Sequence, residues 1–500
     1  MPSLVGSEMC IRDSSKSLDA RGAPRGKKPI YHYIVEGVKS GDEFNHSEFP
    51  QIDAKYAGDP PIIVGAGPAG LFSALRFADY NVPTIIVERG DEATKRMLHI
   101  SKYWRKGILN TESNVCFGEG GAGLFSDGKL ITRVKSPFIS YVMNKFVEFG
   151  APAEVAYISN PHLGSNKIRK IITKISEFLK SQGHEILYNV KVDEFLYEEN
   201  AIVGVKLSDG QTLKSKNIIF ATGHSASEFY KQLHGNNVSM EPKDFAVGVR
   251  IEHPRREIDK FQHGKYSESE FLGAARYRLS HHNKETNKGT YSFCMCPGGY
   301  VLSSGTEADG IVVNGMSNYA RNSPWSNSAL VVTVNKGKDF DQENVLSGLD
   351  FQHAIERKAF EIYKQEADGR MLPAMSVKEF LDNKLSNKPL PKTSSPSGIF
   401  KTNLRDIFPE FINQHLVNGL KEFDKNMKGF SSSEDAILIA PETRTSSPIT
   451  ISRDHQTFQS PSHSGFYPCG EGAGYAGGIT SAAVDGIKVT EAIMAKYISS

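Results

Sequence analysis

The sequence has few cysteines, almost no net charge and no long apolar run. Five cysteines in 500 residues do not make a disulfide framework of the kind found in small secreted domains, so a reducing cytoplasm is the expected location. The 59 Lys and Arg residues nearly cancel the 57 Asp and Glu residues, and a net charge of +2 gives no reason to expect nucleic acid or an anionic membrane as a partner. No stretch approaches the roughly 18 apolar residues of a membrane span, which predicts a soluble protein.

Glycine, in contrast, is abundant, with 45 residues of which many gather in a few tight clusters. Hydrophobic residues make up 39% and charged residues 23% of the chain, an ordinary globular composition that excludes a disordered or fibrous protein. A chain of 500 residues exceeds what one simple core carries, so two or three structural units are expected.

The first residues read as foreign to the fold. Ser3–Ser14 (SLVGSEMCIRDS) resembles a translated transposon-end adapter from sequencing libraries, and it lacks the sustained apolar core of a signal peptide. We therefore exclude residues 1–14 from the fold and expect the true N-terminus to be missing; the alternative is a native disordered leader. Residues 15–59 are then expected to be a remnant of a truncated N-terminal domain, with a strand over Lys28–Val38 and a polar linker over Gly41–Gly58.

A glycine-rich turn at Gly65–Gly70 (GAGPAG) lies between the elements of a dinucleotide-binding unit. The apolar run Pro61–Val64 predicts a buried strand, Leu71–Tyr80 predicts a helix, and Val82–Val87 predicts a second strand. A lone G-x-G-x-x-G is weak evidence, but this order of strand, turn, helix and strand is a strong indication of a bound dinucleotide.

Positions within this motif have separate physical roles. Gly65 permits the tight turn, Gly67 lets the backbone approach a pyrophosphate, and Gly70 lets the helix pack on the strand. The helix N-terminus presents free N–H groups and the positive end of its dipole to the phosphates. Glu88 ends the second strand and is placed to accept hydrogen bonds from a ribose hydroxyl.

Two later segments favour FAD over NAD. A helix predicted over Lys167–Gln182 is followed by a meander of short strands and then by Ala221-Thr222-Gly223. This order resembles the FAD domain of the glutathione-reductase-like flavoproteins, in which the A-T-G turn passes close to the adenosine half of FAD. The short strands are predicted over Glu185–Val190, Lys191–Tyr197, Ala201–Leu207 and Ile218–Phe220.

The C-terminal glycine cluster, Gly465–Gly478, supplies the third element of this resemblance and leads into a helix predicted over Ile479–Tyr497. In such flavoproteins a strand ending in Gly-Asp or Gly-Glu places its carboxylate on the ribityl chain or its phosphate side, and the next helix N-terminus lies under the pyrimidine edge of the flavin ring. Glu471 matches that carboxylate, and Gly477 and Gly478 match the ring-facing amides. A partial positive charge there favours the anionic reduced flavin.

From about Asp19 to Ile493 the chain resembles the FAD-dependent dehydrogenases, also called NAD(P)/FAD-dependent oxidoreductases, that carry a dedicated C-terminal domain. Besides the C-terminal glycine cluster, the stretches that carry the resemblance are Ser113–Leu130, Gly248–Pro254, Tyr291–Gly299 and Glu442–Pro448. The sequence departs from the family at Cys116, where a glutamine is expected, and in its shorter N-terminal region. The resemblance implies an FAD site made by Gly65, Gly67, Pro68, Ala69, Gly70, Glu88, Arg89, Gly120, Gly121, Val192, Ala221, Thr222, Gly223, Gly470, Glu471, Gly477, Gly478 and Ile479.

A second glycine cluster, Gly118–Gly123, also matches G-x-G-x-x-G, but no buried strand precedes it. We interpret it as a loop that wraps the flavin or its diphosphate, where close backbone approach requires glycine, and keep a second nucleotide site as the alternative. Since no second unit of strand, glycines, helix and acid is present, a separate nicotinamide domain is not expected. NAD(P)H, if it is the electron donor, is expected to dock transiently in the substrate cleft.

Three residues are candidates for catalysis. Cys294, in the sequence Cys-Met-Cys, is a redox thiol, half of a metal site with His281 and His282, or a packed loop residue, and we expect no metal. Arg444 binds a substrate carboxylate or a developing oxyanion, or forms a salt bridge between domains. His253 serves as an acid or base, or is a structural histidine.

The expected architecture is α/β, with a Rossmann-like FAD domain split by an inserted mixed α/β substrate domain. The FAD domain is predicted over residues 60–244 and 431–500, and the substrate domain over residues 245–430. The function expected from this organisation is hydride transfer between FAD and a small organic substrate held in the cleft. A flavin monooxygenase and a non-catalytic or RNA-modifying flavoprotein are the alternatives, and the sequence leaves the oligomeric state open.

Overall fold

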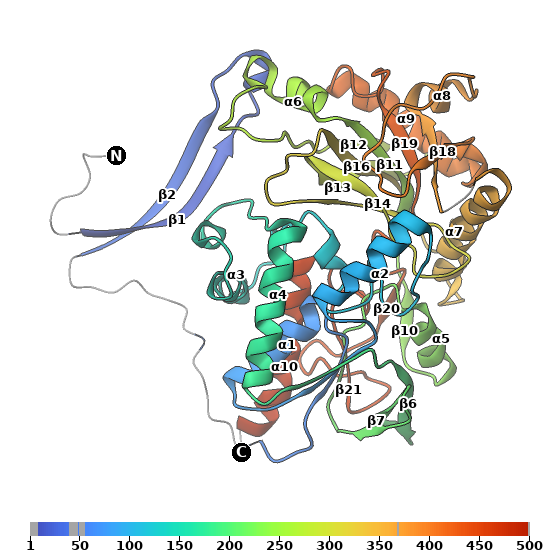
Figure 1. Cartoon of the computed structure of the whole chain (residues 1–500). Coiled ribbons are helices and arrows are strands. Elements are labelled where there is room, and N and C mark those ends of the chain that lie inside the picture. The colour runs from blue at the N-terminus through green and yellow to red at the C-terminus, as the bar shows by residue number, and fades with distance from the viewer. Residues whose placement is uncertain (1–8, 40–48, 50–55, 368–369, 499–500) are drawn as a thin grey trace.

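The computed structural model describes residues 9–39, 49, 56–367 and 370–498. Its N-terminal part is an antiparallel hairpin that stands beside the rest of the molecule (Figure 1), made of β1 (Met9–Asp19) and β2 (Ile30–Lys39). The strand expected over Lys28–Val38 is β2. Most of the linker expected over Gly41–Gly58 lies outside the described residues.

The hairpin corrects the exclusion from the fold of residues 9–14, whereas residues 1–8 lie outside the described residues. Met9 pairs with Lys39 and Asp13 with Val35, so this part of the leader continues β1. The physical reason is that a strand pairs through backbone N–H and C=O groups, which every residue other than proline offers. An unpaired β2 edge therefore accepts a partner whatever its side chains are.

The first domain is built on a five-stranded parallel sheet in the order β21-β9-β3-β4-β5. Its central strands are short, fully buried runs of Ile, Val and Phe, as expected for a parallel sheet covered on both faces. The strands are β3 (Ile62–Val64), β4 (Ile85–Glu88), β5 (Glu185–Tyr188), β9 (Ile218–Phe220) and β21 (Phe466–Pro468).

Helices α1 (Pro68–Asp79) and α10 (Ile479–Ile498) pack side by side, so the two ends of this domain's sequence meet in space (Figure 1). Helix α4 (Gly164–Ser181) has isoleucines and a leucine at helical spacing on its buried face. The other helices are α2 (Ala93–Lys106), α3 (Phe138–Glu148) and α5 (Ser227–Gly235), and the expected meander is β6 (Val192–Glu198), β7 (Ala201–Leu207) and β8 (Thr212–Lys214).

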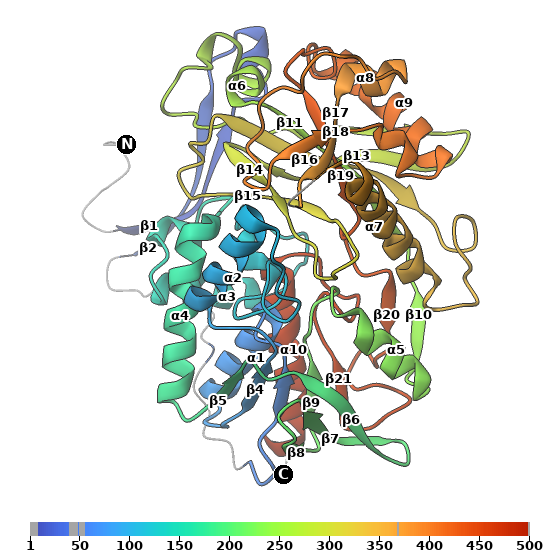
Figure 2. The ribbon, with the colours of Figure 1, turned by 45° about the vertical axis from the view of Figure 1, so that its right-hand side comes forward.

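The second domain contains a seven-stranded mixed sheet in the order β12-β13-β16-β11-β19-β17-β18 (Figure 2). Its strands are β11 (Phe245–Pro254), β12 (Ser280–Asn283), β13 (Lys288–Cys296), β16 (Trp325–Val334), β17 (Leu372–Ser376), β18 (Ile399–Lys401) and β19 (Ile437–Glu442). Its helices are α6 (Arg255–His263), α7 (Ser347–Glu366), α8 (Val377–Asp382) and α9 (Glu410–Asn426).

The boundary at which the chain returns to the first domain differs from the expected residue 431. Strand β19 lies between β11 and β17 inside the second sheet, so residues 437–442 belong to the inserted domain. The chain leaves that domain through β20 (Ile449–Ile451), which pairs with β10 (Met240–Pro242) at the junction. A two-stranded sheet of β14 (Gly299–Ser303) and β15 (Val313–Ser317) completes the second domain.

Among the helices of the described residues, none combines the length and the apolar character needed to cross a bilayer.

Candidate functional site

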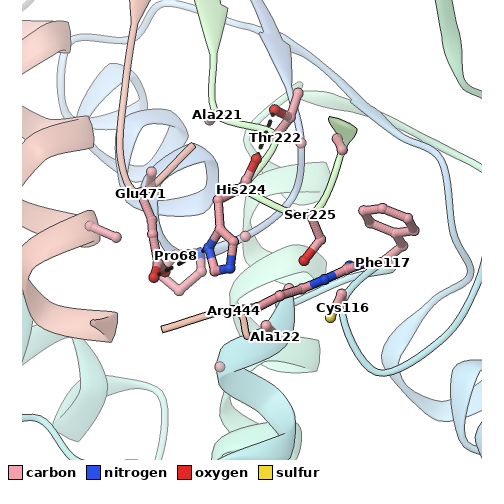
Figure 3. A pocket seen from close by; sticks show the side chains of 18 of the residues that line it. Pro68, Cys116, Phe117, Ala122, Ala221, Thr222, His224, Ser225, Arg444 and Glu471 are labelled. Carbon is pink, nitrogen blue, oxygen red and sulfur yellow. Dashed lines mark hydrogen bonds and ion pairs between the residues drawn. The ribbon is translucent and has the colours of Figure 1, made fainter. Parts of the chain in front are cut away.

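A cavity of about 420 Å³ lies where the first domain meets the second. One side is formed by the turn between β3 and α1, the turn after β9 and the start of α10. The other side is formed by residues of β13, β15 and β19 and by Arg444. The glycine motifs at the two ends of the chain therefore face the inserted domain across one space, part of which is drawn in Figure 3.

The glycines of the β3–α1 turn divide into those that pack and one that faces open space. A Cβ placed on Gly65 would lie 2.5 Å from the carbonyl oxygen of Ala221, and one on Gly70 would clash with the carbonyl oxygen of Gly65. A Cβ on Gly67 meets nothing closer than the Cα of Gly121, at 4.0 Å. Gly67 therefore leaves a cradle at the N-terminus of α1, on the surface where a phosphate is expected.

Glu88 has a larger structural role than ribose binding. Its carboxylate is buried and accepts hydrogen bonds from the backbone N–H groups of Ala66, Gly90 and Gly118, each at 2.9 Å. These three groups belong to the fingerprint turn, the β4 end and the second glycine loop. One side chain thus ties together three loops that line or support the cavity, and it also lines the cavity.

We expect Glu88→Gln to weaken both cofactor binding and folding, because the amide nitrogen cannot accept from a backbone N–H. Each lost charged hydrogen bond is worth about 1.5–3 kcal/mol. Glu92→Gln is the control, since this half-exposed carboxylate pairs with Lys95 at the surface and its loss is worth at most about 1 kcal/mol. Urea unfolding of both variants measures the difference, and equal losses of stability would contradict the role given to Glu88.

The second glycine loop is held by Arg96, a residue that the sequence analysis did not identify. Its guanidinium is fully buried and donates to the carbonyl oxygens of Asn114, Val115, Gly118 and Glu119 at 2.7–3.2 Å. Burial lowers the pKa of Arg96 to about 10. A single arginine in an amphipathic helix carries no sequence signal of such a role.

This loop is also tied to the fingerprint. The N–H of Gly120 donates to the carbonyl oxygen of Ala66 at 2.8 Å, while Gly121 lines the cavity. Both glycine motifs line the same cavity. The loop therefore does not form a second nucleotide site.

The turn after β9 brings Ala221, Thr222 and Gly223 to the cavity wall, followed by His224 and Ser225 (Figure 3). The Nδ1 atom of His224 lies 3.4 Å from Oε1 of Glu471, so the two glycine-flanked turns meet through this pair.

The N-terminus of α10 is open toward the cavity. Gly477, Gly478 and Ile479 line the wall, and a Cβ on Gly477 would meet nothing within 4 Å. The hydroxyl of Thr480 donates to the carbonyl oxygen of Leu130 at 2.7 Å and fixes the helix start against the loop of Asp127–Ile131. The N–H of Gly477, expected as a ring-facing amide, donates to Oγ of Ser481 at 3.3 Å. The helix presents the positive end of its dipole to whatever occupies the cavity.

Of the residues expected at the cofactor, fifteen line the cavity and three support it from behind. Gly70 provides the α1–β3 packing described above. Gly120 holds the loop, and the N–H of Gly470 donates to Asp485 at 2.7 Å. The residues that line the wall are Gly65, Gly67, Pro68, Ala69, Glu88, Arg89, Gly121, Val192, Ala221, Thr222, Gly223, Glu471, Gly477, Gly478 and Ile479.

Arg444 lies at the cavity, but its guanidinium is largely occupied. Nε and one terminal nitrogen pair with the two oxygens of Glu356 at 3.0 and 2.8 Å, and the other terminal nitrogen donates to Thr306 at 2.6 Å. Glu356 is fully buried and raises the pKa of Arg444. Arg444 therefore forms a salt bridge, although both partners lie in the second domain and not in different domains. Its guanidinium is not free to bind a substrate carboxylate.

Glu442, two residues earlier, is a carboxyl group that lines the cavity on the side of the second domain. Its Oε2 accepts from Nε of Arg250 at 3.0 Å, and no hydrogen bond reaches Oε1 from any described residue. Burial raises the pKa of Glu442 to about 7, outweighing the opposite effect of Arg250. The structure thus holds at the cavity wall an acid that gains and loses a proton near neutral pH.

Cys294 also lines the cavity and has an unusual backbone. Its φ is +44°, a left-handed conformation that costs a residue with a side chain about 1–3 kcal/mol. The carbonyl oxygen of Cys294 accepts from Arg250 at 3.2 Å, so the cysteine and Glu442 share the same arginine. Cys296, two residues on, is fully buried.

His253 is not part of this site. Its ring is fully buried near the end of β11, donates through Nε2–H to the carbonyl oxygen of Phe430 (2.7 Å) and packs on the Phe430 ring. Burial lowers its pKa to about 4, so the ring is neutral. The structural interpretation replaces the expected acid–base role. Nor do the described residues contain a group of three or more His, Cys, Asp and Glu side chains able to hold a metal ion, His281 and His282 included.

Several residues at the cavity were not identified as site residues by the sequence analysis. They come from loops whose approach depends on the tertiary fold. They are Asp127, Lys129, His224, Ser225, Asn314 and Glu442.

These observations fit FAD. A glycine cradle opens at the N-terminus of α1, a carboxylate lies at the end of β4, and a second helix N-terminus faces the far end of the same cavity. The first set suits the ADP half of a dinucleotide, and the second suits the electron-rich edge of a flavin ring.

Two family models match the chain. The model described as "Pyridine nucleotide-disulphide oxidoreductase" matches residues 60–249, and the model "FAD-dependent protein, C-terminal domain-like" matches residues 244–445. The second match ends just after β19, in agreement with the boundary that the sheet defines.

Among curated proteins, a Clostridium beijerinckii protein described as uncharacterized is 41% identical over 466 residues, which cover 93% of this chain and 84% of that protein. Protein FixC of Escherichia coli K12 is 28% identical over 206 residues, 40% of this chain and 45% of FixC.

Among solved structures, a triple mutant of the flavin-dependent brominase Bmp2 has a TM-score of 0.40 at 11% identity, covering 89% of this chain and 81% of its own. A geranylgeranyl bacteriochlorophyll reductase-like protein from Thermoplasma acidophilum has a TM-score of 0.38 at 12% identity, covering 88% and 80%.

Proposed function

Because the chain belongs to the family of FAD-dependent oxidoreductases with a dedicated C-terminal domain and FAD is its cofactor, we propose that it transfers a hydride between this flavin and a small organic substrate. The substrate lies at the second-domain side of the cavity, and Glu442 holds the proton that accompanies the hydride. Bound FAD supplies the two-electron chemistry at its ring.

The observation that carries this proposal is the position of Glu442. Reduction of a C=O, C=N or C=C bond consumes a proton as well as a hydride, and oxidation releases one. An acid whose pKa is near the working pH is the most effective group for this transfer. Glu442 lines the cavity with Oε1 free and its pKa at about 7, whereas Arg444 and His253 are committed elsewhere.

The cavity also offers positive potential where negative charge develops. The N-terminus of α10 and Lys129 line the cavity wall, and the buried Arg250 lies behind Glu442 and Cys294. These groups favour an anionic flavin or an anionic substrate, since each is fixed before the reaction. Phe293 and Ile131 add apolar side chains to the cavity wall.

Under this proposal, the electron donor and the substrate bind in the same part of the cavity. The cavity's dinucleotide cradle belongs to FAD, and no second parallel sheet with a glycine-rich turn occurs in the part of the chain that the structure describes. NAD(P)H is therefore proposed to bind transiently over the flavin, with its C4 about 3–3.5 Å from the reactive ring nitrogen.

We expect ping-pong kinetics as a result. Anaerobic stopped-flow mixing with NADH or NADPH should bleach the flavin absorbance without substrate present, and small carbonyl or unsaturated compounds screened afterwards should restore it in a separate step. Bleaching that requires both compounds together would contradict the shared site. Oxygen consumption with a hydroxylated product would indicate a monooxygenase instead.

A further inference from the structure

A second cavity, of about 680 Å³, lies in the second domain where β11 ends and α6 begins. Its wall combines an indole ring, three prolines, three basic side chains and one carboxylate. The side chains that matter for a ligand are Trp325, Arg256, Lys392 and Asp435. We infer that this cavity binds a nucleoside monophosphate, whose base stacks on Trp325 and whose phosphate pairs with Arg256 and Lys392.

The second cavity is separate from the flavin cavity. Glu442 of the flavin cavity pairs with Gly248 of β11, whereas Pro254, at the other end of the same strand, lines the second cavity. The strand between Gly248 and Pro254 is about 20 Å long at the usual rise per residue. Helix α6 accordingly lies toward the opposite end of the molecule from α1 (Figure 2). Bound FAD therefore leaves this space free.

One wall of the second cavity is apolar and rigid. Trp325 begins β16 and pairs with Pro254 of β11. Directly opposite residues of an antiparallel pair carry their side chains on the same face, so the indole and the proline ring stand side by side. Pro324 and Pro391 add two further rings with a fixed φ. The indole is only half-buried, so a planar base can stack on it without a rearrangement of the wall.

Two of the three basic side chains are available to a ligand. Arg256 and Lys392 are exposed, and neither forms an ion pair or a side-chain hydrogen bond with a described residue. Arg255, in contrast, pairs with Asp259 at 3.2 Å and donates to the carbonyl oxygen of Arg321 at 3.2 Å. Two available positive charges match a phosphate monoester, which carries a charge of about −1.5 to −2 at pH 7. The planar guanidinium can also bind two phosphate oxygens at once.

The backbone that carries these cations is fixed on both sides of the cavity. The N–H of Arg255 donates to the carbonyl oxygen of Pro324 at 2.7 Å, which joins the start of α6 to the start of β16. On the other side, close to Lys392 in the chain, the buried carboxylate of Glu252 accepts from the backbone N–H of Ser394 at 3.0 Å. The shape of the cavity therefore exists before a ligand binds, and this lowers the entropic cost of binding.

Asp435 favours a nucleotide over a bare phosphate ion. Its carboxylate is exposed, lines the same cavity and forms no ion pair with a described residue. A carboxylate repels a small anion, but it accepts hydrogen bonds from ribose hydroxyls and from exocyclic amino groups. An acid, two cations and an indole around one space therefore match the sugar, the phosphate and the base of a nucleotide.

The first experiment is isothermal titration calorimetry of the full-length holoprotein with the 5′-monophosphates of adenosine, guanosine, cytidine and uridine. We expect at least one of them to bind with one site per chain. The matching nucleoside and inorganic phosphate should each bind at least about tenfold more weakly, since each lacks one of the two groups recognised. Binding should quench tryptophan fluorescence in the wild type but not in Trp325→Phe, which keeps Trp104 as its single tryptophan.

The second experiment repeats the titration with Arg256→Ala and Lys392→Ala. Each variant should weaken binding about tenfold, the loss expected for one charge-assisted hydrogen bond. Lys388→Ala is the matched control, because Lys388 is exposed in the same segment between α8 and β18 but does not line the cavity, and its affinity should equal that of the wild type.

Four outcomes would overturn this site. They are the absence of binding by all four nucleotides, an affinity that both variants retain, an affinity for inorganic phosphate equal to that for the nucleotide, and release of flavin on addition of the nucleotide. The last outcome would place the nucleotide in the dinucleotide cradle of the first domain. Far-UV circular dichroism of the variants confirms that the exposed substitutions leave the fold intact.

Discussion

Gly67→Val is expected to abolish FAD binding while leaving the protein folded. The reason is the direction of the missing side chain: a Cβ at Gly67 meets no protein atom closer than 4.0 Å, so a valine fits the protein and fills the cradle at the start of α1. The branched side chain takes the place of the pyrophosphate and covers the N–H groups that bind it. The loss should be nearly complete, because a rigid branched side chain and the pyrophosphate cannot share this space.

The measurement is the ratio of flavin absorbance to protein absorbance after purification, with far-UV circular dichroism as the test of folding. FAD, rather than FMN, should be released by denaturation of the wild type. Gly235→Val is the control, since Gly235 ends α5 and a Cβ there meets nothing within 4 Å, so flavin content should not change. Stoichiometric flavin in Gly67→Val would show that the pyrophosphate lies elsewhere.

Glu442→Gln is expected to reduce turnover by about 10²–10⁴-fold, the usual contribution of a general acid or base. The amide keeps the shape of the side chain and its contact with Arg250, but it cannot transfer a proton. In the direction of substrate reduction, the wild type needs the protonated acid, so its rate is full below pH 7 and falls as pH rises through about 7. In the oxidative direction the sign reverses, because the carboxylate must accept the proton.

The readout is the pH profile of kcat in both directions, and the profile of Glu442→Gln should lose the step near pH 7. Glu252→Gln is the matched control: this carboxyl is also buried, on the strand next to β19, but it binds Ser394 and Thr393 and does not line the cavity. A variant at Glu442 that keeps both its rate and the step would remove this residue from the reaction. Flavin content and unfolding temperature, measured alongside, separate chemistry from folding.

The cofactor half of the site is predictable from sequence because its determinants are local. Gly65, Gly67 and Gly70 all lie in one short turn, and their spacing indicates the positions at which a side chain would clash with the protein or with the cofactor. The same holds for Gly477 and Gly478, which precede the helix whose N-terminus they expose. The geometry of such motifs depends only on a few neighbouring residues.

The roles of charged side chains depended on partners far along the chain. Glu88 binds Gly118, 30 residues away, and Arg444 binds Glu356, 88 residues away. His253 lies against Phe430, which no local pattern connects to it. A sequence shows that such a residue is ionisable, but whether it is free for catalysis depends on which partner the fold brings to it.

By itself the sequence determined the class of fold, the order of its elements and the cofactor, because glycine spacing and apolar runs act over a turn or a strand. The tertiary structure decided that β19 belongs to the inserted domain, that residues 9–14 continue a hairpin, and that Glu442 rather than His253 faces the cavity. The physical reason is that strand pairing and burial join residues across long separations. The cost of burying a charge, which raises the pKa of Glu442, exists only once those pairings have closed around it.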